Sequence, residues 1–203
     1  MTNYKQEFID IVSGTIKREG VEELLTYLEK SGFYTSPAST KYHGCYEGGL
    51  LEHSLNVYYS LKDMLKYIFP DSIPYSDETI AIVSLFHDLC KIGKYKKGFR
   101  NVKNQDTGRW EQVECFEYNT DNPAQGHGPA SVYIVQDFIK LTLEERQAIH
   151  WHMGAFDLSQ YNTVNDMGNT FEKNTLAFAL HMADARSKAR GRHKETIQGD
   201  EYV

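Results

Sequence analysis

The stretch SLFHDLCKIGKY, residues 84–95, raises the question that decides how this chain folds. It continues an apolar segment with Ile80 and Val83 at helical spacing, and it places His87 directly beside Asp88. The packing of an apolar helix gives no reason to set an imidazole beside a carboxylate, because buried polar groups need partners. Either a cation binds this pair, or the two residues form a hydrogen-bonded pair at a helix end.

The composition is that of an ordinary globular protein. The chain has 203 residues, of which 40% are hydrophobic and 25% charged, enough for one domain with a sizeable core. No apolar run approaches the roughly 20 residues of a membrane span, so we expect no membrane partner. The N-terminal sequence lacks a basic start followed by an apolar stretch, which predicts a cytoplasmic location.

The three cysteines agree with that location. Cys45, Cys90 and Cys115 are odd in number, widely spaced and contain no C-x-x-C pair. This pattern predicts neither a disulfide framework nor a structural zinc knuckle. Buried or inert thiols are therefore the simpler interpretation.

The net charge of −6 argues against duplex nucleic acid as a partner. A small anionic substrate remains compatible, because a bound metal can supply local positive charge. The one basic run, RSKARGRHK at residues 186–194, is either a solvated helix end or, in its first residues, a rim that attracts phosphate.

The hydrophobic periodicity predicts an all-α domain with a small β-hairpin insertion near residues 97–120. We expect helices over residues 4–18, 20–31, 48–67, 77–90, 128–139, 142–152 and 172–190, with a loop at 159–170. The organisation we expect is a single domain over 1–203, with an N-terminal helical extension (1–40), a core (41–190) and a polar tail (191–203).

Histidines and aspartates on separate predicted helices supply candidate metal ligands. Imidazole nitrogen and carboxylate oxygen suit divalent ions such as Mn, Fe, Co, Ni or Zn, and bundles build metal sites from inward-facing side chains. The candidates, in chain order, are His53, His87, Asp88, His127, His150, His152 and Asp184. Each residue alone is weak evidence, and their order and setting carry the argument.

Four segments together resemble the HD-domain superfamily of metal-dependent phosphohydrolases: HGCYEGGLLEHSLNV, SLFHDLCKIGKY, GHGPASVYI and HWHMG. The resemblance runs from about residue 41 to residue 190 and leaves out the first 40 residues and the hairpin. The Gly-Gly-Leu-Leu-Glu-His form is similar to the branch that includes the HD module of certain bacterial 3′-to-5′ exoribonucleases. It implies an HD-type helical bundle.

The resemblance also implies a ligand set for one or two divalent transition metals, with Mg also compatible. A first ion would be bound by His53, His87, Asp88 and Asp184, and a second by His127 and His152, with Asp88 bridging both. His-His-Gly is common in the family at the last position, and aligning on Gly154 selects His152, with Met153 replacing the partner histidine. His150 is the competing second-metal ligand.

Further residues receive roles from their proximity to these motifs. Asp88 and Lys91 are the catalytic candidates, since Asp88 can orient the nucleophile and Lys91 can stabilise phosphoryl charge. His43, Lys91, Tyr95 and Lys188 are candidates for substrate binding, and His181 shares a helix face with Asp184 and fits a supporting role. Nearby aromatic side chains that could stack a base are Tyr42, Tyr46, Tyr95, Trp151 and Phe156.

The function implied is hydrolysis of a phosphoester by metal-activated water, most simply on a nucleotide, as a phosphomonoester or a phosphodiester. Two alternatives stay open. One is 3′-5′ exonuclease-like action on short RNA or oligonucleotides. The other is a metal-containing module that senses a nucleotide without turning it over. The sequence leaves the substrate, the metal and the oligomeric state undetermined.

Overall fold

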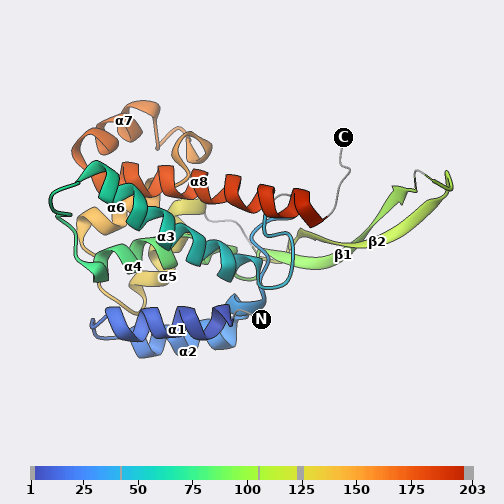
Figure 1. The fold of residues 1–203 in the computed structure, drawn as a ribbon, viewed down its shortest axis with the longest axis horizontal. Helices are drawn as coiled ribbons and strands as arrows, with labels where there is room; N and C mark the ends of the chain where they lie inside the picture. The colour runs from blue at the N-terminus through green and yellow to red at the C-terminus, as the bar shows by residue number, and fades with distance from the viewer. Residues whose placement is uncertain (1–2, 42, 105, 123–125, 199–203) are drawn as a thin grey trace.

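A computed structural model describes residues 3–41, 43–104, 106–122 and 126–198, with side chains through Lys188. The described chain is mostly helical with one antiparallel two-stranded hairpin, which confirms the predicted all-α class with a β-hairpin. The helices gather into one body, and the hairpin projects from one end of it (Figure 1).

The helical prediction locates most elements to within a few residues. The structure has α1 (Tyr4–Thr15), α2 (Val21–Ser31), α3 (Gly49–Ile68), α4 (Asp77–Leu85), α5 (His127–Gln136), α6 (Leu143–Trp151), α7 (Val164–Lys173) and α8 (Thr175–Gln198). Three short 3₁₀ turns are η1 (Phe33–Thr35), η2 (Leu89–Lys91) and η3 (Gly154–Asp157), and the strands are β1 (Tyr95–Lys103) and β2 (Trp110–Tyr118).

Helix α3 packs against three other helices, because eleven of its 20 residues are buried. It packs against α8, α4 and α1, while α6 packs against α8 and α5. Its fully buried residues include Leu50, Val57, Leu61 and Leu65. Each such side chain contributes on the order of 1.5–3 kcal/mol when removed from water, so the core fixes the helices that surround it.

The predicted helix over 77–90 is wrong at its C-terminal end. Helix α4 ends at Leu85, and the chain turns through Phe86, His87 and Asp88 before η2 begins. The amide of Phe86 still bonds to the carbonyl of Ile82, but the next bonds span only three residues, so the chain tightens into a 3₁₀ turn. Apolar spacing continues through the break, which is why periodicity alone did not find it.

Two other boundaries differ from prediction. Residues 159–170 were expected to form a loop, yet α7 begins at Val164, where Thr163 and Asp166 form a capping box. The last helix was expected over 172–190, and α8 instead runs from Thr175 to Gln198, through part of the predicted polar tail. Lys, Arg and Glu are good helix formers even on a solvated surface, so polarity alone does not end a helix.

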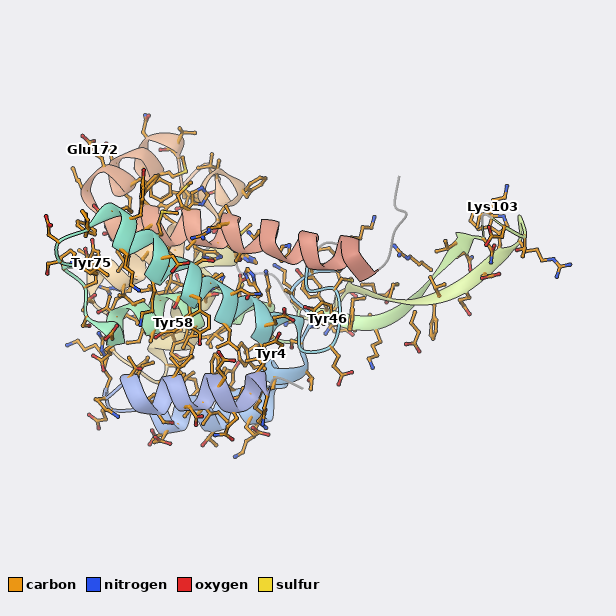
Figure 2. All side chains as sticks on the ribbon, in the orientation of Figure 1. Tyr4, Tyr46, Tyr58, Tyr75, Lys103 and Glu172 are labelled. Carbon is orange, nitrogen blue, oxygen red and sulfur yellow. The ribbon has the colours of Figure 1, made fainter. Side chains whose placement is uncertain are left out.

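The hairpin pairs in register from Tyr95↔Tyr118 to Lys103↔Trp110. Lys103 lies near its far end, well away from the helices (Figure 2). At its base, the amide of Asn119 donates to the carbonyl of Lys94, which ties the second strand back to the segment that follows η2. The base of the hairpin is thereby fixed beside the His-Asp turn.

A buried ion pair joins the α1–α2 connection to α6. Both oxygens of Glu145 accept hydrogen bonds from Arg18, each at 2.6 Å, and Glu145 is fully buried. The same carboxylate accepts from Thr79 Oγ1 at 2.9 Å and from the Thr142 amide at 2.8 Å. Burial opposes ionisation of Glu145, but the bonds from Arg18 and its neighbours outweigh it and lower its pKa.

We predict that Glu145→Gln lowers the free energy of unfolding by about 2 kcal/mol or more, because Arg18 loses its bidentate anionic partner. A depressed carboxyl pKa contributes stability at pH values above the unfolded-state pKa. The difference in unfolding free energy between wild type and variant should therefore be largest above about pH 4.5 and shrink at lower pH. Urea unfolding monitored by circular dichroism at several pH values measures it.

The matched control is Glu29→Gln, which removes an exposed ion pair with Lys5. Exposed pairs contribute about 0–1 kcal/mol, so this control should change stability little. Equal effects of the two substitutions at pH 7 would contradict a structural role for the Glu145 pair.

Candidate metal centre

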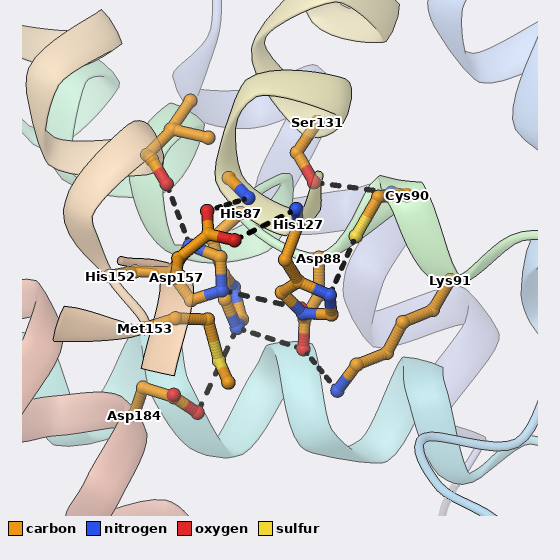
Figure 3. Close-up of polar contacts among 12 residues, drawn as sticks. His87, Asp88, Cys90, Lys91, His127, Ser131, His152, Met153, Asp157 and Asp184 are labelled. Carbon is orange, nitrogen blue, oxygen red and sulfur yellow. Dashed lines mark hydrogen bonds and ion pairs between the residues drawn. The ribbon is translucent and has the colours of Figure 1, made fainter. Parts of the chain in front are cut away.

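Five separate segments bring the six expected ligands to one buried place, and Figure 3 labels all of them except His53. His53 comes from α3, His87 and Asp88 from the turn after α4, and Asp184 from α8. His127 is the first residue of α5, and His152 follows the last residue of α6. Residues far apart in sequence therefore converge, as the prediction required.

In the first group, Nε2 of His53 lies close to the ligand atoms of the other three residues. Nε2 of His53 lies 3.2 Å from Nε2 of His87, 3.1 Å from Asp88 Oδ2 and 3.2 Å from Asp184 Oδ1. Nε2 of His87 lies 3.3 Å from Asp88 Oδ2 and 4.0 Å from Asp184 Oδ1. All four side chains are buried.

These separations fit a divalent ion. For ligands about 2.1 Å from an ion, neighbouring ligand atoms lie about 3.0 Å apart in an octahedron and about 3.4 Å apart in a tetrahedron. Opposite ligands of an octahedron lie about 4.2 Å apart. The observed 3.1–3.3 Å and 4.0 Å match neighbouring and opposite positions respectively.

Hydrogen bonds at Nδ1 of His87 and of His53 leave the Nε2 lone pair of each ring facing the centre of the cluster. Nδ1 of His87 donates to the Ser84 carbonyl at 2.7 Å. Nδ1 of His53 lies 3.3 Å from Ser187 Oγ, whose own hydrogen goes to the Asp184 carbonyl. In these tautomers two Nε2 lone pairs face each other at 3.2 Å, an arrangement that a proton or a cation must stabilise.

Two of the expected ligands have a buried polar atom without a hydrogen bond to any described residue. These atoms are Oδ1 of Asp184 and Nε2 of His152, although the His152 ring is fixed by a 2.6 Å bond from Nδ1 to the Ile149 carbonyl. Buried groups without partners are costly and uncommon. Both atoms point into the cluster, so they fit an ion as their missing partner.

Asp88 directs its two oxygens to two different sets of imidazoles. Oδ2 faces His53 and His87, whereas Oδ1 lies 2.8 Å from His127 Nε2 and 3.4 Å from His152 Nε2. This is the arrangement that a carboxylate shared by two neighbouring ions requires. His53, His87 and Asp88 form one buried group that could hold a metal ion, and Asp88, Cys90 and His127 form another.

Cys90 differs from the other members of the second group. Its Sγ lies 3.5 Å from Nδ1 of His127, on the side of the ring away from Asp88. Burial, followed by the charge of Asp88, raises the pKa of this thiol to about 12. Nε2 of His127 faces Asp88 Oδ1, and Nε2 of His152 lies 3.4 Å from the same oxygen. Because Cys90 lies beside the other nitrogen of the His127 ring, the nitrogen of His152 is the better third ligand beside His127 and Asp88.

Two lysines compensate the buried carboxylates. Lys91 Nζ lies 2.7 Å from Asp88 Oδ2, and Lys188 Nζ lies 2.5 Å from Asp184 Oδ2. Burial alone would raise the pKa values of both carboxyls, but Lys91 at Asp88 and His53 at Asp184 are the leading opposing causes and hold both pKa values well below the usual range. Burial likewise disfavours the charged form of Lys91, and Asp88 outweighs it and raises the Lys91 pKa.

Three further residues that the sequence predicted near the site are His43, Tyr95 and Tyr46. The His43 ring lies 5.3 Å from that of His53, its Nε2 is buried without a hydrogen bond, and burial lowers its pKa to about 3. Tyr95 pairs with Tyr118 at the hairpin base, and burial raises its pKa to about 12. Tyr46 bonds to Glu52 on α3. Tyr42 lies outside the described residues.

His150 points away from the cluster. Its ring lies against Trp151 at 4.8 Å, and both residues line a separate cavity of about 470 Å³ that also contains Arg146. His152, two residues further on, is fully buried and faces His87 with ring centroids 4.8 Å apart. The structure thus brings His152 and not His150 to Asp88.

Several supporting residues were not expected from the sequence. The carboxylate of Asp157 accepts hydrogen bonds from the amides of His127 and Gly128, which fixes the start of α5 (Figure 3). Nδ1 of His181 donates to the His152 carbonyl at 2.7 Å, so its support goes to His152 rather than to Asp184. Ser187 lies three residues after Asp184, a helical spacing from which the sequence could have predicted that the two are close. No feature of the sequence pointed to Asp157.

Gly154 allows the His181 contact. Its φ is +55°, and a Cβ there would lie 2.6 Å from the His181 ring. A residue without a side chain is therefore needed at the position on which the sequence alignment was anchored.

Fold and site together define a helical protein with a candidate metal centre, and no described helix is long and apolar enough to cross a membrane. Comparison with protein-family models, with curated proteins and with solved structures found no match to this chain.

We predict that Ser187→Ala weakens divalent-metal binding about tenfold, because His53 loses the hydroxyl that fixes its tautomer. Calorimetric titration of chelator-treated protein with Mn²⁺ or Zn²⁺ measures the affinity. Ser60→Ala, at a buried serine of α3 whose hydroxyl has no hydrogen bond, is the matched control and should leave it unchanged. An unaltered affinity in Ser187→Ala would show that the hydroxyl does not orient His53.

A second pair of variants separates the two neighbouring histidines. His152→Ala should reduce the metal content from two ions per chain to one, whereas His150→Ala should leave two. Elemental analysis of metal-loaded, gel-filtered protein gives the count. The reverse result would place the second ion on the other side of α6.

Proposed function

We propose that this chain is a metal-dependent phosphohydrolase of the HD-domain type that cleaves a nucleotide phosphoester. The observation that carries the proposal is the position of Asp88, whose two oxygens face two pairs of imidazoles in a buried site. The order of these residues along the chain, which resembles the superfamily signature, supports the same conclusion.

The residues present fit two divalent ions. His53, His87, Asp88 and Asp184 would hold the first, and Asp88, His127 and His152 the second. Bound there, such ions would lower the pKa of water to near neutrality and neutralise charge on the phosphoryl group.

The chain's own residues prepare the site for this chemistry. Burial of the cluster excludes bulk water and strengthens every charge interaction within it. Lys91 keeps Asp88 ionised, and His53 together with Lys188 keeps Asp184 ionised, so that both carboxylates are ready to act as ligands. The bonds to Ser84, Ser187 and Ile149 fix the imidazole rings before any ligand arrives, which lowers the cost of reorganisation.

A small nucleotide is favoured over a polymer. The chain carries a net charge of −6, and cations that bind a nucleic-acid backbone must outweigh local negative charge. On the hairpin, basic Lys96 is opposed by Glu117, so this arm does not present a uniformly basic face.

We predict that Asp88→Asn reduces turnover by more than about a hundredfold, because an amide cannot supply the shared anionic ligand. Release of 4-nitrophenol from bis(4-nitrophenyl) phosphate and from 4-nitrophenyl phosphate, and of phosphate or nucleoside from a nucleotide panel, is measured with added Mn²⁺. Circular dichroism verifies that the variant is folded.

Asp63→Asn is the control, since it removes an exposed carboxylate of α3 that pairs with Arg186. It should leave turnover unchanged. Activity of Asp88→Asn within about threefold of wild type, or no turnover of any of these compounds by wild-type protein with Mn²⁺, Mg²⁺, Co²⁺, Ni²⁺ or Zn²⁺, would refute the proposed function.

A further inference from the structure

The metal centre is closed except at one side. His127 has 15% of its side chain exposed, whereas the other five expected ligands have 3% or less. A substrate that reaches the cluster through the described part of the chain must therefore approach beside His127.

A cavity of about 680 Å³ adjoins this opening. His127 and Met153 border it on the side of the cluster, and η2, α5, η3 and the base of the hairpin contribute its walls. The volume lies within the range of about 300–1,000 Å³ that is typical of small-molecule sites. The cavity beside His150 is smaller and is separated from the cluster, so it does not offer the same approach.

Three exposed aromatic side chains line this cavity. Phe156 is 89% exposed, Tyr118 63% and Tyr133 60%, and they come from η3, β2 and α5. Large aromatic groups left in water gain free energy when a flat apolar partner covers them. Their grouping around one cavity favours a ligand with an aromatic ring.

Polar groups in the same cavity suit the remainder of such a ligand. Lys94 Nζ lies 3.2 Å from His127 Nδ1 and forms no ion pair with a carboxylate in the described structure, so its charge is available to an anion. The side-chain amide of Asn122 donates to the Ile92 carbonyl at 3.4 Å, which leaves its oxygen free within the described residues to accept a hydrogen bond. The ammonium group of Lys94 suits a phosphate, and the side-chain oxygen of Asn122 suits a polar group of a base.

We propose that this cavity binds the nucleoside part of a mononucleotide, with its base among Phe156, Tyr118 and Tyr133 and its phosphate between Lys94 and the metal centre. This inference rests on the proposed function, which it extends by placing the organic half of the substrate.

Equilibrium binding tests the pocket separately from catalysis. Calorimetric titration measures the affinity of the full chain for AMP, GMP, CMP and UMP, with ribose 5-phosphate as the probe that lacks a base. At least one nucleotide should bind tenfold or more tightly than ribose 5-phosphate. Phe156→Ala and Tyr118→Ala should each weaken that nucleotide by about fivefold or more, as loss of base stacking does elsewhere, and leave ribose 5-phosphate unchanged.

Tyr67→Ala is the matched control, because Tyr67 is an 85% exposed aromatic residue of α3 that does not line the cavity. It should alter neither affinity. Equal binding of ribose 5-phosphate and all four nucleotides, or unchanged nucleotide affinity in both aromatic variants, would overturn the pocket assignment even if the protein hydrolyses bis(4-nitrophenyl) phosphate. If a nucleotide binds more tightly than ribose 5-phosphate and the aromatic variants weaken that binding, the pocket assignment stands even without turnover of any substrate.

Discussion

The structure depends on one buried carboxylate, that of Asp88. An ionised group at 1% exposure is costly unless it is fully compensated, and here Lys91 and histidines from three other segments supply that compensation. Helices α3, α5 and α6 must therefore present these imidazoles to the same point. The compensation of Asp88 therefore sets both the packing of these helices and the position of the candidate ligands.

The sequence predicted the bundle and the convergence of its ligands, and the failures have physical causes. Apolar periodicity found α3 and α4, but it could not detect the end of α4 at Leu85, after which the chain turns through Asp88, because apolar spacing continues past that point. The α7 start was readable from Thr163 and Asp166, yet the surrounding Asn and Gly residues suggested a loop. Helix boundaries are therefore predicted best when capping residues are considered together with apolar periodicity.

Helix geometry, which sequence spacing alone did not resolve, brings His152 and not His150 beside Asp88. Residues two apart on a helix face different ways, so only one of them can meet Asp88. Asp157 and Lys94 were beyond prediction, because their roles arise from contacts between segments distant in sequence. Such supporting contacts appear only once the chain is folded.

The pairing of two lysines with two aspartates makes the cluster electrically balanced by itself. A divalent cation bound there would leave a surplus of two positive charges in a buried place, where it is poorly screened. Under the proposed function, a phosphate dianion would offset the surplus of one such ion. Ion and anion would then bind with positive cooperativity, each increasing the affinity for the other by the same factor.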